Sequence, residues 1–215
     1  MGLLDAALSL IFPHKCPFCG CVVNKYGICG ACFKSLPRTG SNYKKKGDFF
    51  SGCVAPLYYE GNVRESLLRF KFSSCSHYAK SYAALVYECI EKEYPEGVDI
   101  VSWVPVSKKR MRSRGYDQAK LLAEEIAKLM GTTAVPVLEK HKHVAAQSGV
   151  GSADKRKANI LGAYRVLNAE LVENKKILLI DDIVTTGATL SECAKTLLKS
   201  GAQQIVCAAV ARDRD

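Results

Sequence analysis

The segment KILLIDDIVTTGATL, residues 176–190, places two acids directly before a threonine-rich loop. The apolar run KILLI predicts a strand buried on both faces of a parallel sheet, and ligands bind beyond the carboxyl ends of such strands. Asp181 and Asp182 stand at that end. The loop that follows offers the candidate phosphate-binding residues Thr185, Thr186, Gly187 and Thr189. Backbone N–H groups at the start of a helix predicted over residues 188–200 would bind a phosphate group there.

The two carboxylates would repel a phosphate group, so they serve another part of the ligand. Asp181 and Asp182 suit either a sugar diol, which donates hydrogen bonds, or a divalent cation. A ribose 5-phosphate meets both requirements, with its phosphate on the loop and its hydroxyls on the acids. Two other interpretations compete: the acids cap a helix, or ILLIDD is the Walker B strand of an ATPase. The chain has no GxxxxGK[ST] motif, which argues against a P-loop ATPase.

Cysteine spacing indicates a metal site near the N-terminus. Of the ten cysteines, four form two Cys-x2-Cys pairs, namely Cys16, Cys19, Cys29 and Cys32. Two residues between thiolates let each pair turn around one ion, and four thiolates make the closed tetrahedral shell of structural Zn²⁺. Unligated thiols or a redox pair are the alternatives. Cys21 lies off the pattern, His14 is an outside candidate, and we expect the other five cysteines to pack as small apolar side chains.

A basic segment follows a predicted buried strand at residues 99–106. Lysine and arginine make up five of the seven residues 108–114, in a chain whose net charge is +10. We predict a loop here that opens at the same sheet edge as the acids, so that Ser107, Lys108 and Arg114 contact a diphosphate group. A nucleic-acid backbone would use the same charges, and a solvated basic turn is the alternative. No aromatic residue interleaves them, so the sequence predicts no base-stacking surface here.

Alternating strands and helices must position these residues. Apolar periodicity predicts helices over residues 62–72, 77–94, 116–130 and 188–200. Strands are predicted within residues 52–61, 99–106, 133–140, 163–167, 176–180 and 204–211. Residues 141–159 have no apolar period and predict a long mobile loop. This alternation is typical of an α/β fold with a mostly parallel sheet flanked by helices.

We expect two domains. Residues 1–48 would hold a short N-terminal helix and the zinc ribbon, ending in the polar linker SNYKKKGD at residues 41–48; the α/β domain would cover residues 49–215. The apolar residues 1–12 lack a basic n-region and a cleavage site, so we predict a helix docked on the body rather than a signal peptide. No apolar run reaches the ~18 residues that span a bilayer, and we expect a cytoplasmic protein without a membrane span.

The stretch IDDIVTTGAT resembles the phosphoribosyl pyrophosphate motif of type I phosphoribosyltransferases: a hydrophobic strand, two acids and a Thr-rich phosphate loop. The resemblance implies a Rossmann-like phosphoribosyltransferase fold in which Asp181 and Asp182 contact the ribose hydroxyls. It also implies that one acid acts near the anomeric carbon and that Mg²⁺ bridges the ribose and the pyrophosphate.

The whole arrangement resembles the ComF family, which is linked to DNA uptake in competent bacteria. The four-Cys ribbon, PVSKKRMRSRGYDQAKLLA and the later segment QSGVGSADKRKANILGAYRV all match that family. The last of these implies that Gln147, Arg156 and Asn159 lie on a loop that closes over the site. This chain has Ser107 where the family often has Pro, Asp117 where Asn is common, and Tyr164 where Phe is usual. The acid at 117 adds a charge that would weaken anion binding nearby.

Two functional hypotheses follow. In the first, the protein is an enzyme that binds phosphoribosyl pyrophosphate with Mg²⁺ and transfers phosphoribose to an unknown acceptor. In the second, the fold is a non-catalytic scaffold that binds single-stranded DNA and a competence helicase, and partners bring it to the inner membrane face. A pure scaffold need not keep both acids, the threonines and the glycine, and this chain has them all. That favours a working ligand site.

Overall fold

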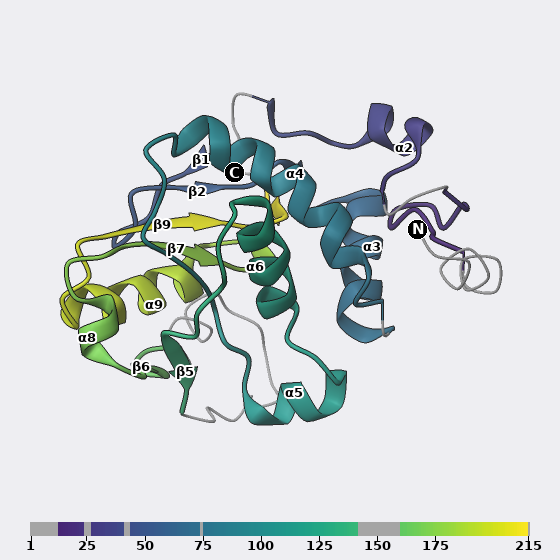
Figure 1. Ribbon diagram of the computed structural model, residues 1–215. Coiled ribbons are helices and arrows are strands. Elements are labelled where there is room, and N and C mark those ends of the chain that lie inside the picture. The colour runs from purple at the N-terminus through teal and green to yellow at the C-terminus, as the bar shows by residue number, and fades with distance from the viewer. Residues whose placement is uncertain (1–12, 24–26, 41–43, 74, 142–159, 215) are drawn as a thin grey trace.

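The computed structural model describes residues 13–23, 27–40, 44–73, 75–141 and 160–214 (Figure 1). Its central sheet has five strands in the order β1-β2-β9-β7-β4. Their bounds are β1 Lys44–Lys45, β2 Cys53–Val54, β9 Gln204–Ala208, β7 Lys176–Ile180 and β4 Ile100–Trp103. All neighbours run parallel except β1 and β2. The predicted α/β fold with a mostly parallel sheet is confirmed.

A second, smaller sheet continues two of these strands. It consists of parallel strands in the order β3-β10-β8, with bounds β3 Leu57–Tyr58, β10 Ala211–Arg212 and β8 Ile183–Val184. β7 passes into β8 through Asp181 and Asp182, and β9 passes into β10 through Ala209 and Val210. The acid pair therefore lies at the junction between the two sheets.

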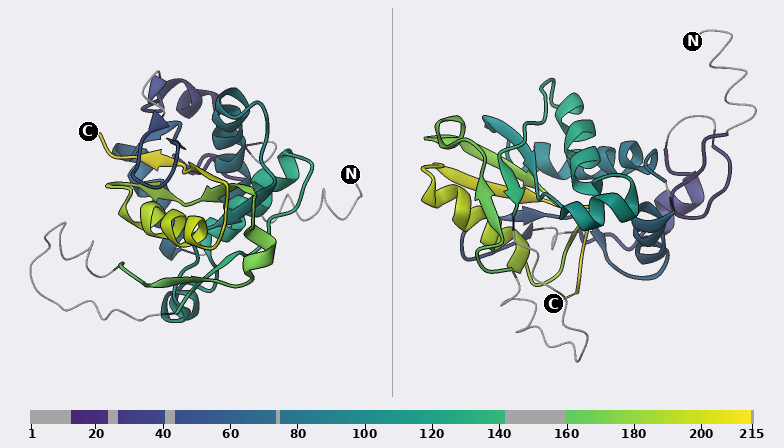
Figure 2. Two further views of the ribbon diagram at one scale, coloured as in Figure 1. Left: turned by 90° about the vertical axis from the view of Figure 1, so that its left-hand side faces the viewer. Right: turned by 90° about the horizontal axis from the view of Figure 1, so that it is seen from below.

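Two layers cover the central sheet (Figures 1 and 2). One contains α3 Gly61–Phe72, α4 Tyr78–Glu93 and α6 Gln118–Leu129; the other contains α8 Ala169–Val172, α9 Ala188–Lys199 and the two-stranded sheet of β5 Leu138–Lys140 and β6 Tyr164–Val166. Successive side chains of β7 divide between them, because strand side chains alternate between faces. Leu178 and Ile180 join the core cluster of the first layer, and Ile177 and Leu179 join that of the second.

Three local predictions need correction. The predicted linker at residues 41–48 contains β1, whose Lys44 and Lys45 pair with Val54 and Cys53 at the edge of the central sheet. The predicted loop at residues 108–114 is a helix, α5 Lys108–Arg114, which begins at a Ser107 cap and ends at Gly115 with φ +79°. Its serine cap and glycine stop are ordinary helix signals that the charge run concealed.

The third correction concerns residues 133–140, which do not form one strand of the central sheet. Ala134 makes a single parallel bridge to Val101, and only Leu138–Lys140 forms a strand, antiparallel to β6. Pro136 lies between them and has no N–H to donate to a ladder, so the pairing breaks there. Among the described residues, no helix has the length and apolar character needed to cross a bilayer.

Candidate active site and metal centre

Main-chain hydrogen bonds fix the acid pair where the chain passes from one sheet to the other. The Asp181 N–H donates to the Ala208 carbonyl oxygen at 3.0 Å, and the Val210 N–H donates to the Asp182 carbonyl oxygen at 3.1 Å. The Asp182 N–H donates to the Asp181 carboxylate Oδ1 at 2.8 Å. The two side chains are thus held at the carboxyl end of β7, as the sequence predicted for a ligand site.

Lys71 neutralises one of the two acids. Its Nζ lies 3.0 Å from Asp182 Oδ2, and both side chains are largely buried. Lys71 comes from the last turn of α3, more than 100 positions earlier in the chain. Sequence reasoning missed it. Its only local signal is a lone lysine between two phenylalanines, FKF, at the end of an amphipathic helix.

Asp181 has a different electrostatic environment. It lies half-buried at the floor of the cleft with protein around most of the carboxyl group. Burial, and then the neighbouring Asp182 carboxylate, raise the pKa of Asp181 from its usual 3.8 to about 8. Without a ligand the pair therefore favours one carboxylate and one protonated acid at neutral pH.

The Thr-rich segment forms a turn that ends in the start of α9. Thr186 Oγ1 accepts from the Ala188 N–H at 3.3 Å, and the Ser191 N–H donates to the Gly187 carbonyl oxygen at 2.8 Å. Gly187 precedes the helix with φ +76°, a left-handed conformation that favours glycine. Thr185, Thr186, Gly187 and Thr189 all line a hollow of ≈ 270 Å³ that also contains Asp181. The structure thus brings the four predicted loop residues to one side of the acids.

A larger cleft of ≈ 530 Å³ adjoins this hollow across the acids. Four cations line it, while the described acids in its wall are only the Asp181–Asp182 pair. Those cations are Lys71, Arg110, Arg114 and Lys140. They come from three separate elements, α3, α5 and β5. An excess of positive charge over a partly protonated acid pair favours a ligand with several negative charges.

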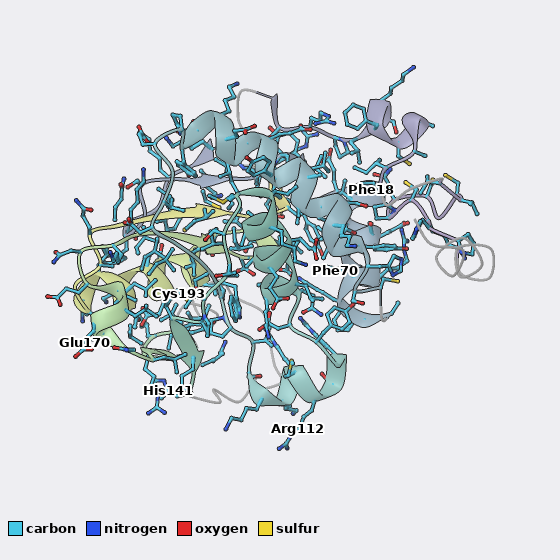
Figure 3. All side chains as sticks on the ribbon, in the orientation of Figure 1. Phe18, Phe70, Arg112, His141, Glu170 and Cys193 are labelled. Atoms are coloured by element: carbon cyan, nitrogen blue, oxygen red, sulfur yellow. The ribbon has the colours of Figure 1, made fainter. Side chains whose placement is uncertain are left out.

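Helix α5 decides which basic residues reach this cleft. Arg110 and Arg114 lie one turn apart on one face of the helix and line the cleft. Ser107 instead accepts the Arg110 N–H at its Oγ, 3.3 Å away, and Lys108 is exposed; neither lines the cleft. Arg112 points into solvent (Figure 3). Treating residues 108–114 as a helix would have selected the arginine pair from the sequence.

Lys140 and Tyr164 form the opposite wall. Lys140 Nζ donates to the Tyr164 hydroxyl at 3.1 Å, and burial, followed by the nearby Arg110, lowers the pKa of Lys140. Tyrosine at 164, where the family usually has phenylalanine, therefore supplies the oxygen that orients this lysine. Sequence reasoning identified neither residue as part of the site. Gln147, Arg156 and Asn159, predicted on a closing loop, lie outside the described residues.

Asp117 does not face the cleft. Its carboxylate accepts the Val106 N–H at 3.1 Å and the Lys120 N–H at 3.2 Å, so it caps α6 and fixes the segment after β4. Burial raises the pKa of Asp117. The carboxylate of Asp117 therefore binds backbone N–H groups, and Asp117 is absent from the described lining of the cleft.

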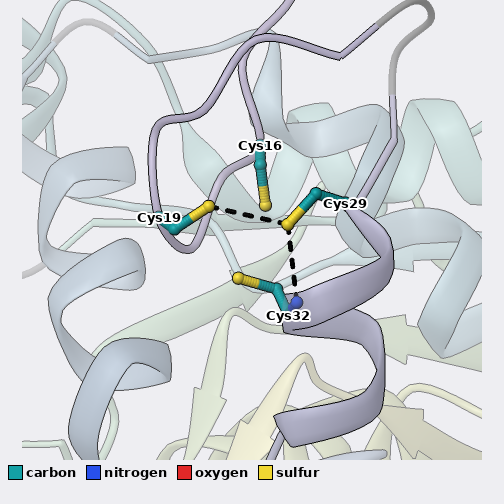
Figure 4. A group of neighbouring side chains, drawn as sticks. All are labelled: Cys16, Cys19, Cys29 and Cys32. Carbon is teal, nitrogen blue, oxygen red and sulfur yellow. Dashed lines mark hydrogen bonds between the residues drawn. The ribbon is translucent and has the colours of Figure 1, made fainter.

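The four paired cysteines meet at one point (Figure 4). The sulfurs of Cys16, Cys19, Cys29 and Cys32 all lie within 4.8 Å of one another. A tetrahedral Zn²⁺ with Zn–S bonds of ~2.3 Å requires sulfurs roughly 3.8 Å apart. Cys19 and Cys29, at 3.6 Å, already meet this requirement. The donor set and the spacing fit structural zinc, and Cys21 stays exposed beside the cluster.

The first cysteine knuckle docks on α3, the helix that carries Lys71. Arg69 Nη2 donates to the carbonyl oxygens of Pro17 and Phe18 at 2.9 and 3.1 Å, and Ser66 Oγ also donates to Pro17. The Phe18 ring packs edge-on against Tyr82, with centroids 5.9 Å apart. The metal centre and the acid pair therefore both contact one helix.

Two family models match the segments that contain the cysteine cluster and the acid pair. The double zinc ribbon domain model matches residues 7–49, and the phosphoribosyl transferase domain model matches residues 112–215. The competence protein ComFC of Bacillus subtilis (strain 168) is 26% identical over 90% of this chain and 75% of that protein. Competence protein F of Haemophilus influenzae is also 26% identical, over 94% of this chain and 85% of that protein.

The chain is similar over most of its length to the ComF-type competence proteins. DNA utilization protein YhgH of Escherichia coli (strain K12) belongs to the same group of matches, at 26% identity over 88% of this chain and 80% of that protein. Solved structures superimpose only loosely: the allosteric regulatory enzyme of purine biosynthesis gives a TM-score of 0.40 at 20% identity, over 60% of this chain and 25% of that chain. The two family models together place a double zinc ribbon before a phosphoribosyl transferase domain.

Replacement of a paired cysteine is expected to release the metal. Cys29→Ser removes one of four thiolates and should lose zinc and lower the melting temperature, because a small ribbon depends on its metal for folding. Metal emission spectrometry of the purified variant measures this loss. Cys21→Ser is the matched control, since Cys21 is a neighbouring cysteine outside the cluster. Equal zinc loss from both variants would contradict this assignment of ligands.

The acid pair is expected to respond oppositely to two amide substitutions. The pKa of Asp181 is higher in the folded protein than in the unfolded chain. Protonation of Asp181 therefore stabilises the fold fully below pH ~4, and this stabilisation is lost as pH rises through about 8. Asp181→Asn, which is neutral at every pH, should raise the melting temperature more at pH 8.5 than at pH 5. Asp182→Asn should lower it at both, because Lys71 loses its carboxylate partner.

Calorimetric melting of the zinc-loaded protein without added Mg²⁺, between pH 5 and pH 8.5, measures both variants against the wild type. A stabilisation by Asp181→Asn that is the same at every pH would contradict the raised pKa. A stabilising Asp182→Asn would contradict the ion pair with Lys71.

Proposed function

We propose that this protein binds phosphoribosyl pyrophosphate and transfers its phosphoribose to an acceptor. The observation that carries the proposal is that two hollows share Asp181, Thr185 and Thr189. The smaller one contains the threonine turn, and the larger one contains the acid pair and four cations. A 5-phosphate would occupy the Thr185–Thr189 turn, and the ribose hydroxyls would donate to Asp181 and Asp182. The diphosphate would lie among Arg110, Arg114 and Lys140, where charge-assisted hydrogen bonds are strongest.

Mg²⁺ would enter with the ligand. The oxygen atoms of the ribose and the diphosphate, with the Asp181 and Asp182 carboxylates beside them, form the hard oxygen environment that this ion prefers. When bound, the ion would neutralise charge on the leaving diphosphate. Ser107 and Lys108 have less support as diphosphate ligands than the arginines of the same helix. Gln147, Arg156 and Asn159 remain proposed members of a loop that excludes water.

The transfer itself is a substitution at the anomeric carbon. The bond from that carbon to the diphosphate oxygen breaks, and its electron pair leaves with pyrophosphate. A lone pair on the acceptor forms the new bond, and the acceptor releases its proton to solvent. The carboxylate of Asp182, held by Lys71, would stabilise positive charge that develops on the ribose ring. Asp181 and Asp182 are thus the proposed catalytic residues.

Calorimetric titration of phosphoribosyl pyrophosphate with Mg²⁺ into the zinc-loaded protein tests the binding step. Asp181→Ala/Asp182→Ala should weaken binding roughly tenfold or more, because charged hydrogen bonds to the ribose are lost. Glu124→Ala/Glu125→Ala is the matched control, an adjacent acid pair on the exposed side of α6. Equal affinity in wild type and acid-pair variant would contradict the site. Binding without pyrophosphate release from any offered nucleobase would contradict the transfer step.

A second function has one observation in its favour: α5 has no buried residue, and five of its seven residues are basic. We propose that this helix contacts the backbone of single-stranded DNA. A competence helicase and a location at the inner membrane face remain proposals that rest on the resemblance to ComF proteins.

Anisotropy of a labelled single-stranded oligonucleotide, measured over a salt series, tests the DNA proposal. The plot of log affinity against log salt should become less steep in the triple variant Lys108→Gln/Lys109→Gln/Arg112→Gln. Its slope should fall in magnitude by about 2, because each lost phosphate contact removes ~0.7. These three side chains are exposed and do not line the cleft. Lys175→Gln/Lys199→Gln, elsewhere on the surface, should leave the slope unchanged. Binding with no salt dependence would reject the electrostatic form of this function.

A further inference from the structure

An exposed aromatic ring stands at the rim of the cleft. Phe72 ends α3 and is 68% exposed, although burial of a phenylalanine side chain is favourable. The preceding residue, Lys71, is the one whose Nζ binds Asp182. The last turn of α3 is therefore fixed against the acid pair, and Phe72 lies next to it on the solvent side.

Arg114 joins this ring to the cleft. Its guanidinium carbon lies 5.1 Å from the centre of the Phe72 ring, within the range of a cation–π contact. Its Nη1 donates to Gln118 Oε1 at 2.7 Å, and both Arg114 and Gln118 line the cleft that contains the acids. A planar cation and an aromatic ring, contributed by two different elements, thus form one surface that leads into the site.

The tertiary structure adds an aromatic ring that the sequence analysis did not place near the basic segment. The basic segment 108–114 contains no aromatic residue, and no stacking surface was predicted there. Folding brings Phe72 from α3 to the arginine that ends α5. A base-stacking surface combines cationic groups with an exposed aromatic ring. The sequence analysis found the cations but no aromatic residue among them.

We propose that Phe72 and Arg114 hold a nucleobase ring. A flat heterocycle stacks on an aromatic face and on a guanidinium plane, and the cations along the cleft suit a ring joined or adjacent to phosphate groups. Phe72 directly follows Lys71, which binds Asp182, and Arg114 lines the same cleft as the acids, so a ring held here would lie close to a bound ribose. The role of this pair as an acceptor site rests on the proposed transfer of phosphoribose. Its role as a stacking surface for a nucleobase does not depend on that transfer.

A second exposed aromatic–cation pair, near the zinc ribbon, lacks this connection. Arg38 lies 4.5 Å from the centre of the Phe33 ring, and Phe33 is 48% exposed, so the pair resembles Phe72 and Arg114 in chemistry. It belongs to the segment around the zinc ribbon, and neither residue is in the described lining of the cleft. Phe33 is therefore a matched control for the stacking role of Phe72.

Quenching of 2-aminopurine, a fluorescent base that loses emission on stacking, tests the proposal on the full zinc-loaded chain. One probe is the free base, with and without phosphoribosyl pyrophosphate and Mg²⁺; the other is a single-stranded oligothymidine that contains one 2-aminopurine. Wild type and Phe33→Leu should quench at least one probe with equal affinity. Phe72→Leu should bind that probe at least about fivefold more weakly, and Phe72→Trp should restore binding.

The two probes separate the sources of the ring. An effect of Phe72→Leu on the free base supports an acceptor, and an effect confined to the oligonucleotide supports a base of single-stranded DNA. Equal affinity of Phe72→Leu and wild type overturns the proposal, and so does the absence of quenching by wild type with both probes. If only the phosphoribosyl proposal is wrong, the calorimetric titration should show no binding of phosphoribosyl pyrophosphate, while quenching of 2-aminopurine should still depend on Phe72.

Discussion

The arrangement of this molecule depends on one electrostatic constraint, the need to keep two adjacent carboxyl groups at the floor of a cleft. Two ionised acids there would repel each other and lose hydration. The structure meets the constraint in two ways: Lys71 pairs with Asp182 at 3.0 Å, and burial holds Asp181 in its protonated form up to about pH 8. Bringing in Lys71 in turn requires α3 to end at this edge of the sheet.

Helix α3 is consequently the element that links the parts of the protein. Ser66 and Arg69 hold the carbonyl groups of the cysteine knuckle, Lys71 holds the acid pair, and Phe72 meets Arg114 at the rim. A ribbon of this size buries too little apolar surface to be stable alone, so it depends on its metal and on docking. Phe18, buried against Tyr82, joins the ribbon to the main core.

Charge around the cleft is arranged by region. The Thr185–Thr189 turn, where we propose that a phosphate binds, offers backbone N–H groups and hydroxyls. Asp181 lines both hollows, and four cations line the larger cleft. The arginines of α5 that point inward belong to the cleft, whereas Lys108 and Arg112 on the same helix face solvent. One short helix thus presents positive charge both to a small anionic ligand and to the surrounding solution. The two proposed functions use different sides of it.

The sequence alone determined the features whose parts are neighbours in the chain. Strand, acid pair, turn and helix start follow one another within residues 176–190, and the four cysteines lie within 17 positions, so spacing was enough to predict both sites and the parallel α/β fold. Only the tertiary structure decided which distant residues meet them. The local sequence does not place Lys71, Lys140 or Phe72 near the cleft, because their positions depend on how α3 and β5 pack on the sheet. The mistaken loop at α5 had a different cause: its run of charges predicted a loop, whereas the local Ser107 cap and Gly115 stop form a helix that places Arg110 and Arg114 in the wall of the cleft.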